Sequence, residues 1–405
     1  MRFVIATYGS RGDVQPMLAL SLALLHRGHQ VLLAAPPEKA GWAEQMGCPF
    51  YPLGSDLTAF TDNLDRVYSS RCLARSVLFL RRELKTQFEI LPQIVAKADV
   101  IIGSSLIGAA PSIAQDRKIP YRYIAFTPQV LPSDYHPFPA FSSHHLPRWV
   151  NHMTWRIAKF VDRLNHTRLI NLYRQKMGLK PIDDAWRHII GDHVIVASDS
   201  VLAKVPNDVN IPWLIQTGYM HLKQPTQTSI ALKKFIEKGP APIYAGFGSM
   251  PKRDQIEGIA AIVKAVRLTG QRVVINRFWD EPTCFDNCED ILFIGKYPHL
   301  DLFRDMSVII HHGGAGTTAT AAFCGIPQII VPHLLDQYYW GAKVQQLQIG
   351  PKPIRRSKLK ASSLAKAIET CIFNPQFQNN AQKIARMIHQ TDSLEETVET
   401  ILNSL

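Results

Sequence analysis

Glycines cluster with small and hydroxyl-bearing residues between positions 307 and 327, where the chain reads SVIIHHGGAGTTATAAFCGIP. We expect a strand over 307–310, a loop over 311–316 and a helix over 317–324. Glycine lets an anion approach the backbone N–H groups of such a loop, and the N-terminal end of the helix adds a positive potential. The segment therefore predicts a phosphate or diphosphate site. Close packing of a helix on a strand also favours glycine, so the loop alone leaves that alternative open.

Side chains beside these glycines can add hydrogen bonds to the same anion. A protonated His312 can donate a charge-assisted bond, and the hydroxyls of Thr317 and Thr318 lie in the first turn of the expected helix. The lysine found in the phosphate loop of ATPases and GTPases is absent here, which disfavours those enzymes. The loop positions expected to bind a diphosphate are His312, Gly313, Gly314, Ala315, Gly316 and Thr317.

A second polar pair follows the next apolar run, 328–331, and is expected at the same edge of the sheet. Asp336 offers hydrogen-bond acceptors and Gln337 an amide, a combination that suits the vicinal hydroxyls of a hexose. Capping of the following helix, 338–347, explains the Asp336 carboxylate equally well.

A shorter glycine loop, YGSRGD, ends the first apolar run of the chain. Asp13 closes this loop, and from the residues alone a general base and a cap of the first helix are equally open. An exposed aspartate is a weak base because its pKa is about 3.9, and burial against an apolar acceptor would raise that pKa. Arg11 can contact a phosphate or pair with Asp13, and Gly12 can bring its backbone to the same phosphate.

The apolar runs that position these loops do not alternate with polar residues, as expected for parallel strands buried on both faces. In each half of the chain the first run leads through a glycine loop into a helical pattern. We therefore expect an α/β fold of two doubly wound, Rossmann-like domains facing across a cleft, with ligands at the carboxyl ends of the strands. The runs are 2–7, 29–35, 100–102, 121–126 and 193–197 in the first half and 242–247, 272–276, 291–294 and 307–310 in the second.

The boundary between the domains is expected at a mostly polar segment that contains Pro225. The division is an N-terminal domain over 1–218, a linker over 219–229, a C-terminal domain over 230–388 and a C-terminal helix over 389–405 that can return to the N-terminal domain.

Composition narrows the class of protein. Of 405 residues 46% are hydrophobic and 19% charged, which is typical of a globular chain and argues against disorder. The N-terminal apolar run is too short for a secretory signal, and no run approaches the roughly 18 apolar residues of a membrane span. We expect a cytoplasmic protein, soluble or peripheral to a membrane. The six cysteines are scattered, and reduced thiols are the expectation, since Cys284 and Cys288 alone are a weak zinc signal.

Positive charge is unevenly distributed. The net charge is +12, and residues 66–187 contain 19 Lys and Arg against 8 Asp and Glu. An anionic membrane surface, a nucleic acid or an acidic substrate would each fit such a segment, and a solvated basic face explains it as well.

The segment 126–155 is rich in aromatic residues, proline and histidine, and we expect it to bind an apolar acceptor through Phe138, Phe141 and Trp149. A metal site is disfavoured because Asp134 is the only acid of the segment and cysteine is absent. Together with the basic segment, this loop suggests that the domain docks on an anionic membrane and takes up a lipidic hydroxyl, such as a sterol or diglyceride. The alternative is a soluble natural product such as a polyketide or flavonoid.

Three motifs carry a resemblance to a known family. The stretch HHGGAGTTATAAFCGIPQIIVPHLLDQYYWGAKVQQLQIG closely resembles the donor-binding signature of the UDP-glycosyltransferase family, which has the GT-B fold. GSRGDVQPMLALSLALLHRGH and YAGFGSMP are similar to motifs of its sterol and antibiotic (vancomycin-type) glucosyltransferase branch. The resemblance implies an inverting transferase that moves a hexose, glucose first of all, from a UDP-sugar to a hydroxyl of an apolar acceptor. It implies no metal, no cofactor besides the co-substrate, and no nucleic-acid partner.

The resemblance also implies roles for matching positions. Asp13 would be the general base, His312 and the backbone up to Thr317 would bind the diphosphate, and Ser249 would add a phosphate contact. Asp336 and Gln337 would bind the sugar hydroxyls.

Departures from the family pattern concern the nucleoside. Lys296 stands where an aromatic residue covers the uracil; Tyr297 can replace that ring, and His299 is in register with the family motif. Thr320 stands where plant members have a ribose-binding glutamate. The loop reads Gly-Ala-Gly where plant members have Trp-Asn. Whether the base is uracil or thymine stays open.

Other functions remain as alternatives. Gly314, Gly316 and Ala319 fit part of a dinucleotide fingerprint, but Asp336 follows Pro332 in a loop rather than ending a strand, which disfavours a dehydrogenase. A sugar-nucleotide epimerase of the same fold and a non-catalytic protein that binds a sugar nucleotide are the other candidates.

Overall fold

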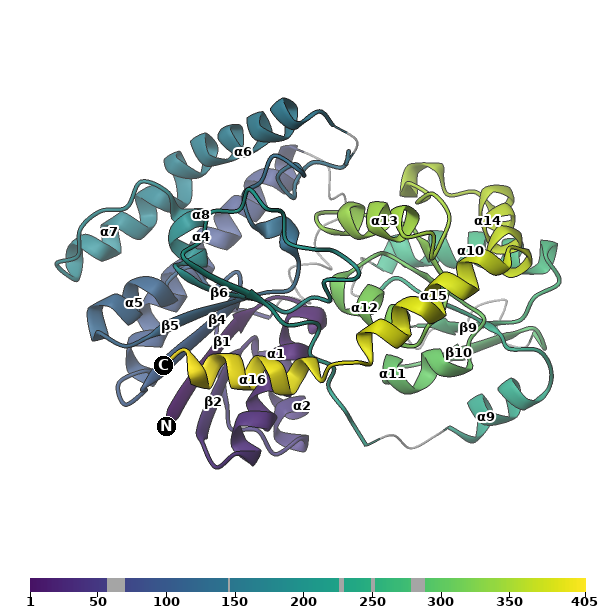
Figure 1. Cartoon of the computed structure of the whole chain (residues 1–405), viewed down its shortest axis with the longest axis horizontal. Helices are drawn as coiled ribbons and strands as arrows, with labels where there is room; N and C mark the ends of the chain where they lie inside the picture. Colours follow the sequence, from purple (N-terminus) through teal and green to yellow (C-terminus); the bar gives the residue numbers. More distant parts are fainter. Residues whose placement is uncertain (57–69, 145, 226–228, 249–251, 278–287) are drawn as a thin grey trace.

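The computed structural model describes residues 1–56, 70–144, 146–225, 229–248, 252–277 and 288–405. These residues form two α/β domains, each built on one parallel sheet with helices on its faces (Figure 1). The expected fold class, two Rossmann-like domains, is confirmed. Among the described residues no helix is long and apolar enough to cross a membrane.

The first domain contains a seven-stranded sheet in the order β3-β2-β1-β4-β5-β6-β7, and all neighbouring strands are parallel. Its strands are β1 (Arg2–Tyr8), β2 (Gln30–Ala35), β3 (Phe50–Pro52), β4 (Val100–Ser105), β5 (Tyr121–Ala125), β6 (His193–Val196) and β7 (Trp213–Gln216). Its helices are α1 (Arg11–His26), α2 (Ala40–Gln45), α4 (Ser70–Ile94), α5 (Ala110–Arg117), α6 (Arg148–Asp162), α7 (Arg168–Lys176) and α8 (Ala185–Ile190).

The second domain contains a five-stranded parallel sheet in the order β10-β9-β8-β11-β12. Its strands are β8 (Ile243–Gly246), β9 (Val273–Asn276), β10 (Ile291–Ile294), β11 (Val308–His311) and β12 (Gln328–Ile330). The helices that follow the first sheet are α9 (Ile230–Glu237), α10 (Lys252–Leu268), α11 (His299–Leu302), α12 (Ala315–Phe323), α13 (Gln337–Gln346), α14 (Ala361–Phe373), α15 (Pro375–Ile388) and α16 (Ser393–Asn403).

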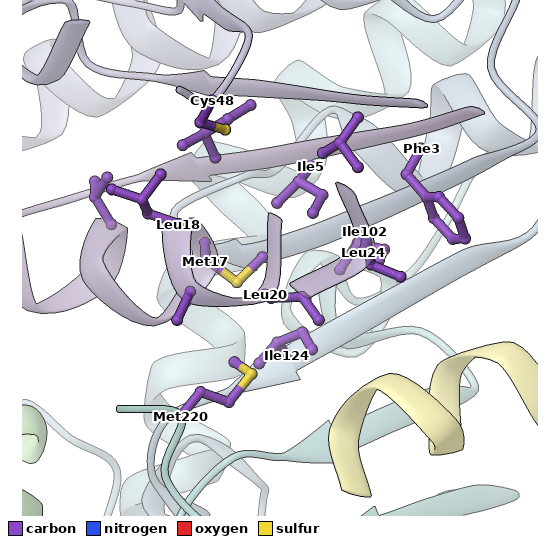
Figure 2. Packing of buried hydrophobic residues seen from close by; sticks show 14 of the residues in the cluster. Phe3, Ile5, Met17, Leu18, Leu20, Leu24, Cys48, Ile102, Ile124 and Met220 are labelled. Atoms are coloured by element: carbon purple, nitrogen blue, oxygen red, sulfur yellow. The ribbon is translucent and has the colours of Figure 1, made fainter. Parts of the chain in front are cut away.

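The packing of α1 on the first sheet fixes the glycine loop before it. Figure 2 shows Met17, Leu18 and Leu24 of α1 against Ile5 of β1, and all four side chains are fully buried. Side chains of this size contribute about 1.5–3 kcal/mol each when fully buried. The start of α1 is therefore held at the carboxyl end of β1, where a ligand of a parallel sheet is expected.

The C-terminal helix α16 lies on the first domain, beside α1 (Figure 1). Val398 and Ile401 of α16 are fully buried in the core cluster of that domain. The guanidinium of Arg27 forms ion pairs with Glu395 and Glu399 of α16. The end of the chain thus ties the two domains together.

Candidate functional site

The carboxyl ends of the two sheets face each other, so that loops from both domains share one site. The hydroxyl of Tyr219 lies so close to Gly316 at the start of α12 that a Cβ atom on this glycine would lie 2.5 Å from it. Burial first, and then the negative charge of Asp13, raise the pKa of this tyrosine. The glycine loop at 311–316 is called the donor loop below. Asp13 and the donor loop therefore lie on the two sides of one cleft.

Three hydrogen bonds fix the Asp13 carboxylate. Its Oδ2 accepts from the backbone N–H of Ser10 at 2.7 Å and from the Ser10 hydroxyl at 3.0 Å, while Oδ1 accepts from the Ser105 hydroxyl at 2.6 Å. Ser10 is the N-cap of α1, and Asp13, the third residue of the helix, forms a capping box with it. Asp13 thus belongs to the capping box, although Ser10 is the N-cap residue. The capping hydrogen bonds hold its carboxylate at the cleft.

Burial raises the pKa of Asp13, and its hydrogen bonds oppose that rise only in part. A carboxylate with a raised pKa is a better proton acceptor than an exposed one, as a general base requires.

Ser105 is a site residue that the sequence did not indicate. It ends β4 opposite Tyr8 of β1 and has a positive φ of 54°, a backbone conformation that costs a residue other than glycine about 1–2 kcal/mol. This conformation accompanies the hydrogen bond from its hydroxyl to Asp13. The only signal in the sequence is that two serines end an otherwise apolar run, and the partner became clear only from the register of β4 on β1.

The rest of the first glycine loop supports Asp13. A Cβ atom on Gly9 would overlap the Asp13 carboxylate, so the glycine is required there. The N–H of Gly12 donates to the Ser10 hydroxyl at 3.3 Å and is therefore used within the cap. The guanidinium of Arg11 lies 4.8 Å from the centre of the Trp42 ring, and burial lowers its pKa. Arg11 is within electrostatic reach of Tyr219 and Tyr244, which places its charge on the side of the second domain.

The donor loop differs from the expectation at both of its ends. β11 extends to His311, and α12 begins at Ala315, two residues earlier than predicted, with Gly314 as its N-cap. The N–H of Gly313 donates to Nδ1 of His311 at 3.1 Å, and the other ring nitrogen of His311 lies 2.9 Å from the Gln328 side-chain oxygen. The early start leaves the N–H groups of Ala315, Gly316 and Thr317 without acceptors inside the helix.

His312 lies beside this helix start and is half-buried, with its Nδ1 atom covered. Its Nδ1 has no hydrogen-bond partner among the described residues. Burial, reinforced by His311, His333 and His299, lowers the pKa of His312 well below its ordinary value. The lowered pKa disfavours a protonated His312 and favours donation from a neutral imidazole. A Cβ atom on Gly314 would lie 2.5 Å from its Nε2, so this glycine keeps the ring accessible from the loop.

Asp336 occupies the N-cap position of α13, but its side chain makes no capping hydrogen bond with the described residues. Burial first, and then the charge of Asp13, raise the pKa of Asp336 to about 7. The Oε1 atom of Gln337 accepts from the N–H groups of His333 and Leu334 at 2.8 and 3.0 Å, so only its amide nitrogen remains for a ligand. The capping alternative therefore fails to explain Asp336, whereas Gln337 has a structural task in shaping the loop.

Two residues expected near the nucleoside lie beside β8, and His299 is within electrostatic reach of Arg11 and His312. The Nε2 atom of His299 lies 3.0 Å from the Tyr244 hydroxyl, and its ring stacks on Phe303 with centroids 4.6 Å apart. Burial, with Arg11 and His311 nearby, lowers the pKa of His299 to about 3. Tyr297 packs against the same core cluster and remains partly exposed. Ser249 lies outside the described residues.

A cavity of about 540 Å³ opens between the first domain and α13. Drug-sized ligands occupy cavities of about 300–1,000 Å³. Its walls come from both domains: Tyr135, His136, His144, Tyr339, Ala342, Lys343, Gln345 and Gln346. Burial lowers the pKa of His136 to about 4, and its Nε2 has no hydrogen-bond partner within the described part of the chain. The aromatic segment thus reaches the cleft through residues that the sequence did not single out for an acceptor.

The three residues expected to bind the acceptor are separated by the fold. Phe138 packs edge-to-face against Trp155 and Trp186, with centroids 5.2 and 5.3 Å apart. Phe141 is on the surface, and Trp149 is 71% exposed on α6. No group of three potential metal ligands occurs among the described residues.

Substitution of Asp336 tests the electrostatics of the cleft. The pKa of Asp336 is about 7 in the folded chain and lower in the unfolded chain. The folded chain therefore binds this proton more tightly, and the stability that this difference provides is lost as pH rises towards 7. Asp336→Asn cannot ionise and should be more stable than the wild type at pH 8, by about 1–3 kcal/mol, with a smaller gain at pH 5. Thermal unfolding at both values measures this; Asp392→Asn, at the cap of α16, is the control. A gain that does not depend on pH would contradict a raised pKa.

Comparisons of the sequence and the fold with known proteins identify the family of this chain. Two family models match the chain: the glycosyltransferase family 28 N-terminal domain over residues 3–134 and the erythromycin biosynthesis protein CIII-like C-terminal domain over residues 272–403. The chain is 32% identical over 355 residues to the vancomycin aglycone glucosyltransferase of Amycolatopsis orientalis, which covers 86% of this chain and 85% of that protein.

A plant relative and a solved structure extend the comparison. Sterol 3-beta-glucosyltransferase UGT80B1 of Arabidopsis thaliana is 27% identical over 430 residues, which cover 98% of this chain and 67% of that protein. The crystal structure of glycosyltransferase VinC in complex with dTDP has the same fold, with a TM-score of 0.69 at 19% identity over 100% of this chain and 99% of that chain. The chain therefore belongs to the GT-B glycosyltransferase family that includes the vancomycin-type and sterol glucosyltransferases.

Proposed function

We propose that this glycosyltransferase is inverting and moves a hexose, with glucose as the first candidate, from a UDP-sugar to a hydroxyl of an apolar acceptor. One observation carries the proposal. The half-buried Asp13 carboxylate, fixed by Ser10 and Ser105, lies within electrostatic reach of Asp336 on the other side of the cleft. A proton acceptor and a site for a departing diphosphate thus flank the space where a sugar would lie.

In the proposed reaction the acceptor oxygen attacks the anomeric carbon while Asp13 takes its proton. The bond between that carbon and the diphosphate oxygen breaks, and its electron pair leaves with the nucleotide from the opposite face of the sugar. The N–H groups of Ala315, Gly316 and Thr317, which have no acceptor among the described residues, would stabilise the charge that develops on the diphosphate together with His312. The acceptor oxygen ends bonded to the sugar with inverted configuration.

The sugar hydroxyls would contact Asp336 and the amide nitrogen of Gln337. The nucleoside would lie towards Tyr297. The resemblance makes UDP the first candidate for the nucleotide. UDP is not the only candidate, because Lys296 replaces the aromatic residue of the family and Thr320 replaces its ribose-binding glutamate. The structure of VinC contains dTDP, so a dTDP-sugar is the nucleotide to test beside a UDP-sugar.

The cavity beside α13 is the proposed acceptor site. Ala342→Trp would fill part of it and should raise the acceptor KM at least about tenfold, because an apolar acceptor loses burial worth about 25 cal/mol per Å². Nucleotide affinity should be unchanged. Steady-state kinetics measures both quantities, and Ala361→Trp at the start of α14 is the control. An unchanged KM would remove the cavity from the proposal.

A donor screen tests the proposed function as a whole. UDP- and dTDP-sugars are incubated with and without a pool of sterols, lipids and polyphenols, and nucleotide release is measured. Release that depends on an acceptor, with a new glycoside detected by mass spectrometry, supports the proposal. Conversion of the donor without any acceptor would instead identify an epimerase, and no turnover with any donor would leave a binding protein.

A further inference from the structure

Helix α6 and its continuation carry an exposed apolar face that the active cleft does not use. Side chains at helical spacing are exposed along one side, and the large ones among them range from 41% to 71% exposed. A π-helical turn, Arg163–Thr167, joins α6 to α7 without a break. Figure 1 shows both helices along the edge of the first domain. The members of this face, called the α6 face below, are Trp149, Met153, Ile157, Phe160, Val161 and Leu164.

A row of basic side chains runs beside the α6 face. Each member precedes an apolar member by one residue, so that on a helix the two rows are adjacent and parallel. All five basic residues are exposed, and two of them pair with acids outside the helix, His152 with Asp134 and Lys159 with Asp184, both at 3.0 Å. Between positions 148 and 176 the chain has seven Lys and Arg and a single acid, Asp162. The row consists of Arg148, His152, Arg156, Lys159 and Arg163.

The opposite side of α6 is attached to the wall of the cleft. The Thr154 hydroxyl accepts from the N–H of Phe138 at 2.9 Å, and the side-chain amide of Asn151 donates to the Asp134 carbonyl at 2.9 Å. The indole N–H of Trp155 donates to the His136 carbonyl at 3.1 Å. His136 lines the cavity beside α13. Whatever the α6 face binds is therefore brought close to the proposed acceptor site.

We propose that the α6 face docks on an anionic lipid surface. A helix that combines Trp, Phe and Leu with an adjacent basic row lies in the interface of a bilayer, with its apolar side chains among the acyl chains and its cations at the headgroups. The 15 residues of α6 extend about 22 Å, enough to span several lipids. A second copy of this chain is the poorer partner, because it would bring an equally basic row to the interface.

The location of the face deepens the proposed function, on which this last step rests. A docked α6 would place the opening between Tyr135 and α13 next to the membrane, because Arg148 at the start of α6 lies over the Tyr135 ring at 4.2 Å. A lipidic hydroxyl could then pass from the bilayer to the cavity without crossing water. Docking itself requires neither a sugar donor nor turnover.

Vesicle flotation tests the docking without activity. Wild-type protein is mixed with phosphatidylcholine vesicles, with or without phosphatidylglycerol, at about 0.1 M and about 1 M salt. We expect it to float with the anionic vesicles at low salt and to float much less at high salt. Trp149→Ser/Phe160→Ser should lower the bound fraction about tenfold or more, and Arg156→Glu/Arg163→Glu should do the same.

Matched controls lie on the second domain. Ile230→Ser/Phe373→Ser removes two apolar side chains that are 74% and 76% exposed, and Lys366→Glu/Lys383→Glu reverses two exposed charges; both should float like the wild type. Retained nucleotide binding shows that each variant is folded.

The docking proposal would be overturned if the wild type floats with no vesicles, or floats with neutral and anionic vesicles equally. It would also be overturned if the control variants lose as much vesicle binding as the α6 variants. A dimer that Trp149→Ser dissociates would assign the α6 face to self-association instead. Flotation without sugar transfer would leave docking intact and contradict the proposed function alone.

Discussion

Asp13→Asn should lower kcat for sugar transfer about 10²–10⁴-fold, which is the usual contribution of a general base, while nucleotide affinity stays near the wild-type value. Asparagine can keep the hydrogen bonds to Ser10 and Ser105 but cannot take a proton. The loss of a charged residue in the capping box should cost only about 1 kcal/mol of stability. Initial rates with the acceptor found in the donor screen and calorimetry with the nucleotide measure the two effects.

The pH profile separates the base from the cap. The wild-type rate should fall as pH drops through the pKa of Asp13, which burial raises above the ordinary range of aspartate, because only the ionised carboxylate accepts a proton. This limb should be absent from the residual activity of Asp13→Asn. Asp392→Ala weakens the cap of α16, where the Asp392 carboxylate accepts two backbone N–H bonds, and this variant should transfer normally. If both variants lose turnover equally, Asp13 acts through folding and is not the base.

His312→Ala should lower kcat about 10²–10³-fold, as expected when one donor to a developing negative charge is removed. The imidazole of His312 lies beside Gly314, the N-cap of α12, and its Nδ1 has no partner among the described residues. Nucleotide affinity should also fall, by about 10- to 150-fold, because one hydrogen bond to a charged group contributes about 1.5–3 kcal/mol.

A surface histidine supplies the control for this variant. His26→Ala removes an exposed imidazole at the end of α1 and should change neither rate nor affinity. His312→Gln, which keeps a side-chain N–H donor, should recover part of the lost rate. If His312→Ala binds UDP and dTDP as tightly as the wild type binds them, the diphosphate does not contact His312.

The fold could be predicted because parallel strands buried on both faces give nearly continuous apolar runs in the sequence. Runs such as 2–7 and 307–310 contain hardly any polar residue, and each leads into a glycine loop. The start of α12 was placed two residues late because glycine disfavours a helix interior, whereas Gly316 is tolerated in the first turn, where the helix has no hydrogen bonds to lose.

Pairings between distant residues could not be predicted. Ser105 reaches Asp13 only because β4 lies beside β1 in the register Tyr8–Ser105. The lowered pKa of His312 follows first from burial and then from the proximity of His311, His333 and His299, which a linear pattern does not show. Trp149 and Phe138 belong to the same aromatic segment, yet α6 turns one outward and the fold packs the other inside.

The most direct test of the central claim is a calorimetric titration of the purified chain with UDP and with dTDP, since the whole mechanism depends on a nucleoside diphosphate at the N-terminal end of α12. We expect one binding site for at least one of the two nucleotides, weakened by His312→Ala and retained by Asp13→Asn. Absence of binding by both nucleotides would contradict the account, whatever the acceptor.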